Sequence, residues 1–240
     1  MYKFDGIKTE GIWLLAQNRF ENNKPFYEEH KEEIKKLVIN PAKQLAAIIA
    51  EDMYKYDSFM ELNPSKMVSR IRRDTRFSKD KSMYRENVWI MFMRSKKTDP
   101  FVPCFWFEFF QDHYTCGVGA FETNARVNEI YRQKILDNPS EFRKAVKSCL
   151  SAGCQLGGIS YKKPNKSTDT LPKDIQNIYN MKNVSFRKTF SDISKLEKEE
   201  FIDELRYIYR KMNLFYQFML KVYQQYKLER SEFSCEQRDI

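Results

Sequence analysis

Apolar residues recur at helical spacing near the start of the chain. Ile7, Gly11, Ile12, Leu15 and Phe20 fall on one face of a helix that ends near the Asn22-Asn23 pair and Pro25. A second, highly charged helix is predicted over residues 26–37, and helical spacing resumes through Leu45, Ile48, Ile49 and Met53. Pro41 suits the first turn of that helix, with Asn40 as its N-cap. We expect these helices to be scaffold.

The pattern changes from helical to strand-like after the turn signal Asn63-Pro64-Ser65. Short β-branched or aromatic runs follow, separated by polar or proline-containing connections, which favours antiparallel pairing of about four strands. The runs VWIMFM and CFWFEFF are apolar on both faces, which predicts a sheet largely covered by helices. The expected strands are residues 67–73, 88–93, 104–110 and 115–121, with two more at 155–163 and 184–190.

Helical spacing also dominates the second half of the chain. Helices are predicted over residues 122–136, from Asn138 to Gly153 and near Lys173 to Asn180. Ser194 and Glu197 have the spacing of a capping box, from which a helix should run to about Lys227. Its apolar residues follow a 4-3 spacing that suits core packing or a coiled coil with a partner. They are Phe201, Leu205, Ile208, Met212, Phe215, Met219, Val222 and Tyr226.

This order of elements predicts an α+β fold. We expect one domain over residues 1–240, in which N-terminal and C-terminal helices cover a mainly antiparallel central sheet. Residues 228–240 should form a frayed tail. Residues 163–170 make the best linker candidate, but the segment is too short for a domain boundary.

Composition agrees with a globular chain. Hydrophobic residues make up 42% of the 240 residues and aromatic residues 15%, which excludes a disordered chain. No secretory signal or apolar run of membrane-spanning length is visible, so we expect no membrane association. An odd number of cysteines, five, without a C-x-x-C pair favours reduced, buried thiols, a cytoplasmic location and no metal site.

The net charge of +9 is concentrated in one stretch. Between Lys66 and Glu86 there are eight Lys or Arg residues and three acids, which gives this window a charge of +5. Basic proteins favour anionic partners such as nucleic acids or phosphorylated molecules. Acids interleaved with arginines indicate an ordered, salt-bridged loop.

The same stretch resembles a known family. Its residues are similar to the block R-x-x-RD-x-RFS-x-DK-x-PYK of a group of conserved hypothetical proteins from bacteria and fungi, called domain of unknown function 2461. The resemblance extends from about Gly11 to Phe218 and implies one mixed α and β domain. It brings no established activity. The matching positions are Arg70, Arg73, Asp74, Arg76, Phe77, Ser78, Asp80, Lys81, Tyr84, Arg85 and Asn87.

Further positions support or depart from this likeness. The Asn22-Asn23 pair followed by Phe26-Tyr27 resembles the family's NN-x-x-WF, and residues 117–119 resemble its G-x-G strand end. The departures are Met83 in place of Pro, Arg85 in place of Lys and Phe26 in place of Trp. Without that proline, the backbone conformation of the loop is less restricted.

Two hypotheses describe the basic block. In the first, a pocket binds a small phosphorylated or carboxylated ligand, with bidentate arginines fixing its orientation. In the second, an internal ion-pair network joins Arg73 and Arg76 to acids and orders a loop over the sheet. The proposed ligand-binding residues are Arg70, Arg73, Arg76, Ser78, Lys81, Tyr84 and Arg85, and the supporting carboxylates are Asp74, Asp80 and Glu108.

No motif in the sequence names a reaction. Asp80, Glu108, Tyr84 and Ser78 are eligible acids, bases or nucleophiles, but the chain lacks the nucleophile elbow, the phosphate-binding loop and the zinc-protease motif. The catalytic residues are therefore unknown and no cofactor is expected. His30 and His113 fit surface or local hydrogen-bonding roles.

A nucleic-acid-binding module is the alternative from another class. In that hypothesis Lys162, Lys163, Lys166, Arg187 and Lys188 line one basic face with the central block, and Phe77 or Tyr84 stacks on bases. The acids in the block oppose it. A flat basic stripe would favour nucleic acid, and a concave pocket would favour a small anion.

Overall fold

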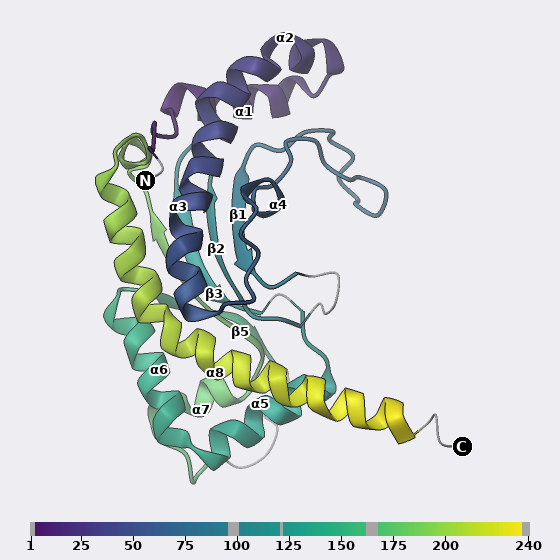
Figure 1. The fold of residues 1–240 in the computed structure, drawn as a ribbon, viewed down its shortest axis with the longest axis vertical. Coiled ribbons are helices and arrows are strands. Elements are labelled where there is room, and N and C mark those ends of the chain that lie inside the picture. The colour runs from purple at the N-terminus through teal and green to yellow at the C-terminus, as the bar shows by residue number, and fades with distance from the viewer. Residues whose placement is uncertain (1–2, 96–100, 121, 162–167, 237–240) are drawn as a thin grey trace. The chain divides into compact units, whose positions relative to one another are not determined.

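The computed structural model describes residues 3–95, 101–120, 122–161 and 168–236 (Figure 1). Five strands form one antiparallel sheet in the order β1-β2-β3-β5-β4. They are β1 (Val88–Met93), β2 (Cys104–Phe109), β3 (Tyr114–Gly119), β4 (Gln155–Ser160) and β5 (Met181–Phe190). The α+β class and the antiparallel sheet are thereby confirmed.

Helices make up most of the remaining described chain. The first half contains α1 (Thr9–Glu21), α2 (Lys24–Ile34), the π-helical turn η1 (Lys35–Ile39), α3 (Asn40–Tyr56) and α4 (Pro64–Met67). The second half contains α5 (Ala125–Asp137), α6 (Pro139–Ser151), α7 (Lys173–Tyr179), the 3-10 turn η2 (Ile193–Glu197) and α8 (Glu200–Glu236). No described helix combines the length and the apolar character that crossing a membrane requires.

The chain forms two compact units. The first consists of Met1–Phe92, Trp106–Cys116 and Thr189–Arg206, and the second of Met93–Phe105, Gly117–Lys188 and Tyr207–Ile240. The expectation of one domain over residues 1–240 stays a prediction. Helix α8 extends to Glu236, beyond the expected end near Lys227, and residues 237–240 lie outside the described part. The frayed tail therefore also stays a prediction.

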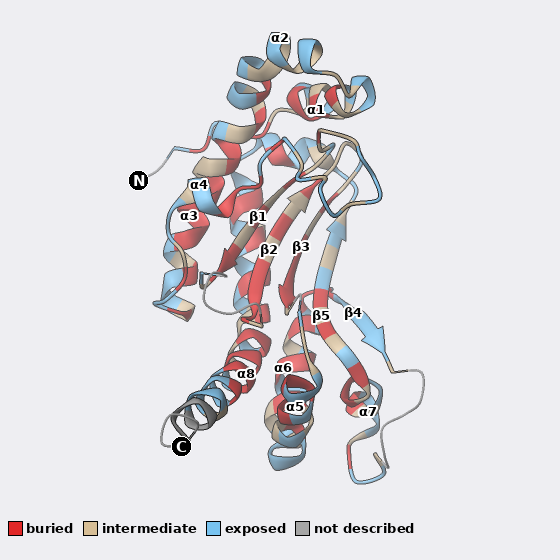
Figure 2. Cartoon of the chain, turned by 90° about the vertical axis from the view of Figure 1, so that its right-hand side faces the viewer, coloured by how far each residue is buried: buried red, intermediate tan, exposed pale blue. Residues whose placement is uncertain are grey.

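Burial in the first unit follows strand alternation. Phe107 and Phe109 of β2 are fully buried, whereas Trp106 and Glu108, on the other face of the strand, are half-buried. Most of β2 is coloured as buried in Figure 2. Phe107 packs against Phe201 of α8, with ring centroids 5.9 Å apart. The two faces of this strand are therefore not equally covered.

The second unit has its own aromatic core. Phe215 of α8 packs against Phe142 of α6 and, edge to face, against Phe186 of β5. Phe105 of β2 stacks on Tyr216 of α8 with centroids 4.7 Å apart. All eight residues of the predicted 4-3 pattern are buried, so within the structure they form core.

Pro41 lies in the first turn of α3, as predicted, but Asn40 is not the N-cap of that helix. Asn40 has helical dihedral angles and no capping side-chain hydrogen bond, and α2, η1 and α3 run on without a break. A proline inside a helix cannot donate to the carbonyl four residues earlier, here that of Leu37. The π turn accommodates the proline, and the Leu37 carbonyl instead accepts the Lys8 N–H at 3.0 Å.

The predicted capping box at Ser194 is also wrong. Asp192 accepts the Ser194 N–H and begins the 3-10 turn, and α8 starts only at Glu200. The Glu197 carboxylate accepts the Thr9 N–H at 2.9 Å, so it caps α1 across a long sequence separation. By contrast, Asn138 caps α6 as predicted, because its Oδ1 accepts the Glu141 N–H.

Gly11 allows α1 to lie directly on the π turn. A Cβ atom at this position would lie 2.5 Å from the Leu37 Cβ and 2.8 Å from the Val38 Cγ2. Replacing glycine by alanine within a helix ordinarily raises stability by about 0.5–1 kcal/mol. Here the close approach of the two segments reverses that expectation.

We therefore predict that Gly11→Ala lowers the free energy of unfolding by about 1–3 kcal/mol, the usual cost of overpacking. Gln17→Ala, at an exposed position of the same helix, is the control and should change it by less than about 0.5 kcal/mol. Urea unfolding of both variants measures the difference. Equal or greater stability of Gly11→Ala would contradict this packing.

Candidate functional site

Residues 68–90 form an irregular two-stranded ribbon, not the regular strand predicted for residues 67–73. The structure has only isolated bridges, Val68 with Ile90 and Arg72 with Tyr84. Ser69 N–H donates to the Trp89 carbonyl and Arg85 N–H to the Ile71 carbonyl. Between these two hydrogen bonds the chain advances two residues on one strand, from Ser69 to Ile71, and four on the other, from Arg85 to Trp89. The two extra residues on the second strand interrupt the ladder.

Alternation along this ribbon separates the arginines of the basic block. Ile71 is buried and the side chain of Arg73 is only 17% exposed, whereas Arg70 and Arg72 are exposed. The alternation of side chains in an extended segment accounts for this division of faces. The inward and outward arginines have different surroundings.

Arg73 is held by the loop that it begins. Its guanidinium donates to the Asp80 carboxylate, to the Ser78 hydroxyl at 3.3 Å and to the Ser82 carbonyl at 3.4 Å. Its backbone N–H donates to the Met83 carbonyl at 2.8 Å and closes the loop. Arg73, Ser78 and Asp80 are therefore brought together as a loop-closing cluster.

Helix α1 holds the same loop from outside. Arg19 donates to the Asp80 Oδ2 at 2.7 Å, and the Asn22 Oδ1 accepts the Met83 N–H at 2.7 Å. Asn22 ends α1 in the left-handed conformation, with φ of 48°, which asparagine tolerates better than most residues. The end of α1 thus fixes both Asp80 and the return of the loop.

These contacts make Asp80 a strongly acidic carboxyl. Hydrogen bonds from the Ser82 hydroxyl and backbone N–H, followed by that from Arg73, hold its pKa well below the ordinary value. The carboxylate is thereby kept ionised at neutral pH, with its oxygens occupied by donors. This arrangement suits a structural anchor more than a general base.

Arg76 forms a separate, exposed pair at the tip of the loop. Its guanidinium binds the Asp74 carboxylate through two nitrogens, at 3.0 and 2.7 Å, and lowers the pKa of Asp74 to about 2. Phe77 is 94% exposed, and Lys81 donates to the Thr75 carbonyl. Arg76 and Lys81 thus point to partners within the loop.

Tyr84 and Arg85 follow the loop and are covered by aromatic rings. Tyr84 is 3% exposed and stacks on Tyr27 of α2, with centroids 4.8 Å apart and planes inclined by 27°. Arg85 lies over the Trp89 ring, 4.0 Å from its centroid. Burial, followed by the repulsion of Arg73, lowers the pKa of Arg85.

Glu108 has a different partner from those we predicted. Its carboxylate accepts a hydrogen bond from the Asn87 amide, and the structure gives it no hydrogen bond to Arg73 or Arg76. Burial raises its pKa, and the nearby His113 and Arg85 oppose that rise. His113 itself bonds to Asp112, and His30 to the Phe26 carbonyl, which are local roles.

The outward arginines line a cavity of about 500 Å³ in the first unit. Arg70 and Arg72 form one side of it, together with Ser65 and Ser69. Its volume lies in the range of small-molecule sites. Five cationic side chains line the cavity, namely Lys31, Lys35, Lys43, Arg70 and Arg72, and Glu32 is the acidic residue among its lining.

A single helical face supplies a second part of the lining. Tyr27, Lys31, Lys35, Ile39 and Lys43 line the cavity at intervals of four residues. In a regular α-helix, a spacing of four advances about 40° per step around the axis. The wider π turn between Lys35 and Ile39 offsets this drift, so that Lys43 of α3 stays on the face that begins in α2.

These helical residues were expected to be scaffold, and their place in the cavity was not predicted. The signal that could have found them is the four-residue spacing of lysines after Tyr27. Two of these lysines have acidic neighbours one turn away, Lys31 with Glu28 at 2.6 Å and Lys35 with Glu32 at 3.5 Å. Within the described part of the chain, Arg70, Arg72 and Lys43 form no ion pair.

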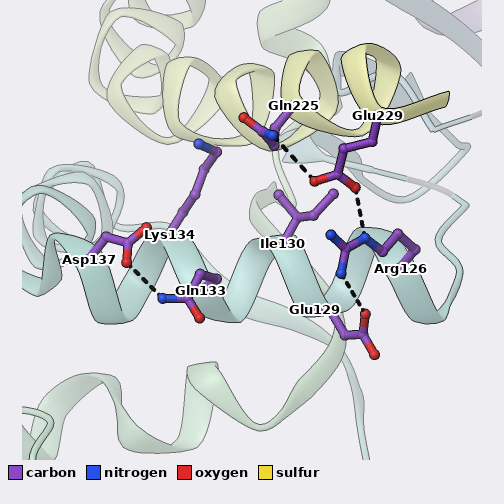
Figure 3. A pocket seen from close by; sticks show the side chains of 8 residues that line it. All are labelled: Arg126, Glu129, Ile130, Gln133, Lys134, Asp137, Gln225 and Glu229. Atoms are coloured by element: carbon purple, nitrogen blue, oxygen red, sulfur yellow. Dashed lines mark hydrogen bonds and ion pairs between the residues drawn. The ribbon is translucent and has the colours of Figure 1, made fainter. Parts of the chain in front are cut away.

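Other cavities have compensated or acidic linings. In the second unit, a cavity of about 510 Å³ between α5 and α8 contains Arg126, which is bound by both Glu129 and Glu229 (Figure 3). In the first unit, a cavity of about 310 Å³ is lined mainly by acids, among them Glu51 and Glu199. The cavity at Arg70 is thus the basic one of these three.

The other residues of the predicted nucleic-acid face belong to the second unit or lie outside the described residues. Arg187 and Lys188 belong to β5 in the second unit, and Lys162, Lys163 and Lys166 lie outside the described residues. Among the cysteines, Cys104, Cys116, Cys149 and Cys154 are buried. In the described ranges no group of three or more His, Cys, Asp and Glu side chains is placed to hold a metal ion.

Comparison with known proteins gives one family. A family model described as "Conserved hypothetical protein (DUF2461)" matches residues 12–218. No curated protein matches the chain. The matched range contains α1 from Ile12 onward, the loop and every residue of the basic cavity.

We predict that Arg73→Ala and Arg76→Ala differ in stability. Arg73 is largely buried and bonds to three groups, so its loss should lower the melting temperature by roughly 4 °C or more. The side chain of Arg76 is 77% exposed and pairs with one exposed acid, so its loss should lower the melting temperature by less than about 2 °C. Thermal unfolding at low and high salt measures both losses of melting temperature. Equal losses would contradict the distinction between a buried Arg73 and an exposed Arg76.

Asp80→Asn should remove part of the acid dependence of stability. Because the pKa of Asp80 is lowered in the folded state, its contribution is full above the unfolded pKa near 4 and is lost as the pH falls below it. The stability difference between wild type and Asp80→Asn should therefore shrink below about pH 4. Urea unfolding between pH 7 and pH 2.5 measures it, and a difference independent of pH would contradict the assignment.

Proposed function

The chain belongs to the DUF2461 family of conserved hypothetical proteins, which has no established activity, and we propose that this protein binds a small phosphorylated or carboxylated molecule in the basic cavity. The observation that carries the proposal is the group of cations without an ion-pair partner in that concave space of about 500 Å³. Of its five cations, Lys31 and Lys35 pair with acids, whereas Arg70, Arg72 and Lys43 form no ion pair among the described residues. Anionic ligands favour such sites because the field inside a cleft is focused.

The arrangement of the cations supports a compact ligand. Arg70 and Arg72 come from an extended segment, and the lysines come from a helical face opposite. Two guanidinium groups on one side give the directional, bidentate contacts that phosphate and carboxylate groups accept. Lysines on the other side supply charge without fixed geometry.

This proposal narrows the set of ligand residues expected from the sequence. Arg70 contacts the ligand, joined by Arg72 and the three lysines. Arg73, Asp80 and Ser78 hold the loop, and Tyr84 supports the wall through Tyr27. Arg76 and Lys81 are engaged within the loop, and Arg85 is stacked on Trp89.

The concave shape favours a small ligand over a nucleic-acid strand. Glu28 and Glu32 pair with the lysines of the helical wall and would repel an extended phosphate backbone. A small anion avoids them by lying between Arg70, Arg72 and Lys43. The nucleic-acid hypothesis requires a longer basic surface than this cavity supplies.

Calorimetric titration with inorganic phosphate, pyrophosphate and citrate at low salt tests the proposal. We predict saturable binding of at least one of them, and a loss of affinity of about tenfold or more in Arg70→Gln and in Arg72→Gln. Arg187→Gln, which removes the same charge from an exposed position of β5, is the matched control and should bind as wild type does.

Two outcomes would overturn the proposal. One is the absence of binding for all three anions at low salt. The other is an equal loss of affinity in Arg187→Gln, which would show a response to net charge alone. Binding of a random oligonucleotide with a steep salt dependence, together with no binding of the three anions, would favour the nucleic-acid alternative.

A further inference from the structure

An aromatic ring stands at one end of the basic cavity. Tyr27 is half-buried and lines the cavity, although a tyrosine adds nothing to its charge. Its side chain begins the helical row that continues with Lys31 and Lys35. The cavity therefore joins an aromatic surface to a cationic one.

The Tyr27 ring is fixed from behind. It stacks on Tyr84, whose own ring is 3% exposed and whose backbone is bridged to Arg72. A ring supported in this way loses little conformational freedom when a second ring stacks on it. The Tyr27–Tyr84 pair has the form of a preorganised stacking platform.

Cations share the cavity with the platform. Arg72 is bridged through its backbone to Tyr84, and Lys31 follows Tyr27 by about one turn of α2. Both cations also line the cavity. A ligand that stacks on Tyr27 therefore has cations within reach of an attached phosphate.

We propose that the ligand of this cavity is a mononucleotide, with its base stacked on Tyr27 and its phosphate bound between Arg70, Arg72 and Lys43. The inference rests on the proposed function, since it assumes that the cavity binds an anion. It adds the class of ligand, a phosphate that carries a flat aromatic group. Stacking is tolerant of base identity, because every base presents a π face.

A single nucleotide fits better than a strand. The cavity of about 500 Å³ is in the range that holds one drug-sized ligand. One aromatic platform holds one base, whereas proteins that bind single strands use successive rings along a groove. The cavity lining contains a single aromatic residue, Tyr27.

Comparing AMP with ribose 5-phosphate in the wild-type protein separates stacking from phosphate binding. Both molecules carry the same phosphate and sugar, and only AMP carries a base. We expect AMP to bind roughly tenfold or more tightly, as a stacked base contributes. The comparison, by calorimetry at low salt, requires no variant that might fail to fold.

Variants of Tyr27 assign the effect to the ring. Tyr27→Phe keeps the π face and should keep the affinity ratio of AMP to ribose 5-phosphate, whereas Tyr27→Leu should reduce it to near one. The affinity of Tyr27→Leu for ribose 5-phosphate should stay within about twofold of wild type. Thermal unfolding of each variant without ligand confirms that it is folded before the ratio is read.

Each result tests either the anion site or the mononucleotide as its ligand. Equal binding of AMP and ribose 5-phosphate by wild type would overturn the mononucleotide and leave the anion site standing. Absence of binding for both, and for pyrophosphate, would overturn the anion site as well. A high ratio that survives in folded Tyr27→Leu would place the base away from Tyr27 and also overturn the inference. Tighter binding of a short oligonucleotide than of AMP would favour a strand instead.

Discussion

The π turn at Lys35–Ile39 is the local constraint on which the first unit depends. Pro41 cannot donate to the Leu37 carbonyl, and that carbonyl accepts the Lys8 N–H at the start of α1. Gly11 then brings α1 into direct contact with Leu37 and Val38. The far end of the same helix supplies Arg19 and Asn22, which hold the loop of the basic block. An interrupted hydrogen bond in one helix thus sets the position of another helix and of a distant loop.

The same turn shapes the cavity wall. It keeps Lys43 of α3 on the face defined by Tyr27, Lys31 and Lys35, which four-residue steps along an uninterrupted α-helix would gradually rotate away. π turns often occur at functional sites because they realign side chains without ending a helix. In this chain one backbone feature serves both the packing of α1 and the alignment of the lysines.

The sequence was most informative where one physical pattern dominates. Short apolar runs between polar connections predicted β1 and β2, and the 4-3 spacing predicted the buried face of α8, because burial of apolar surface decides both. Local signals failed where distant residues intervene. Asn40 before Pro41 is typical of an N-cap, but here the helix runs on through both, and the Leu37 carbonyl that Pro41 leaves without a donor accepts the Lys8 N–H. Glu197 caps α1 instead of its own helix.

The candidate site was only partly predictable for the same reason. The alternation of Arg70, Ile71, Arg72 and Arg73 correctly separated an outward from an inward pair. Which acid binds which arginine depends on how the loop folds back, and no spacing rule gave Asn87 as the partner of Glu108. The wall at Lys31, Lys35 and Lys43 was missed because a charged helical face is ordinarily solvated.

The arginines of the basic block fall into two groups, those paired with acids inside the loop and those that line the cavity. Arg73 and Arg76 each have a carboxylate partner, so the loop needs no ligand to balance them. Arg70, Arg72 and Lys43 form no ion pair among the described residues, and their mutual repulsion slightly opposes folding. A protein that keeps like charges together in a concave wall gives up stability that opposite charges at these positions would supply. An anion between them removes that repulsion and stabilises the folded state through its binding, which gives this unbalanced wall a physical reason to exist.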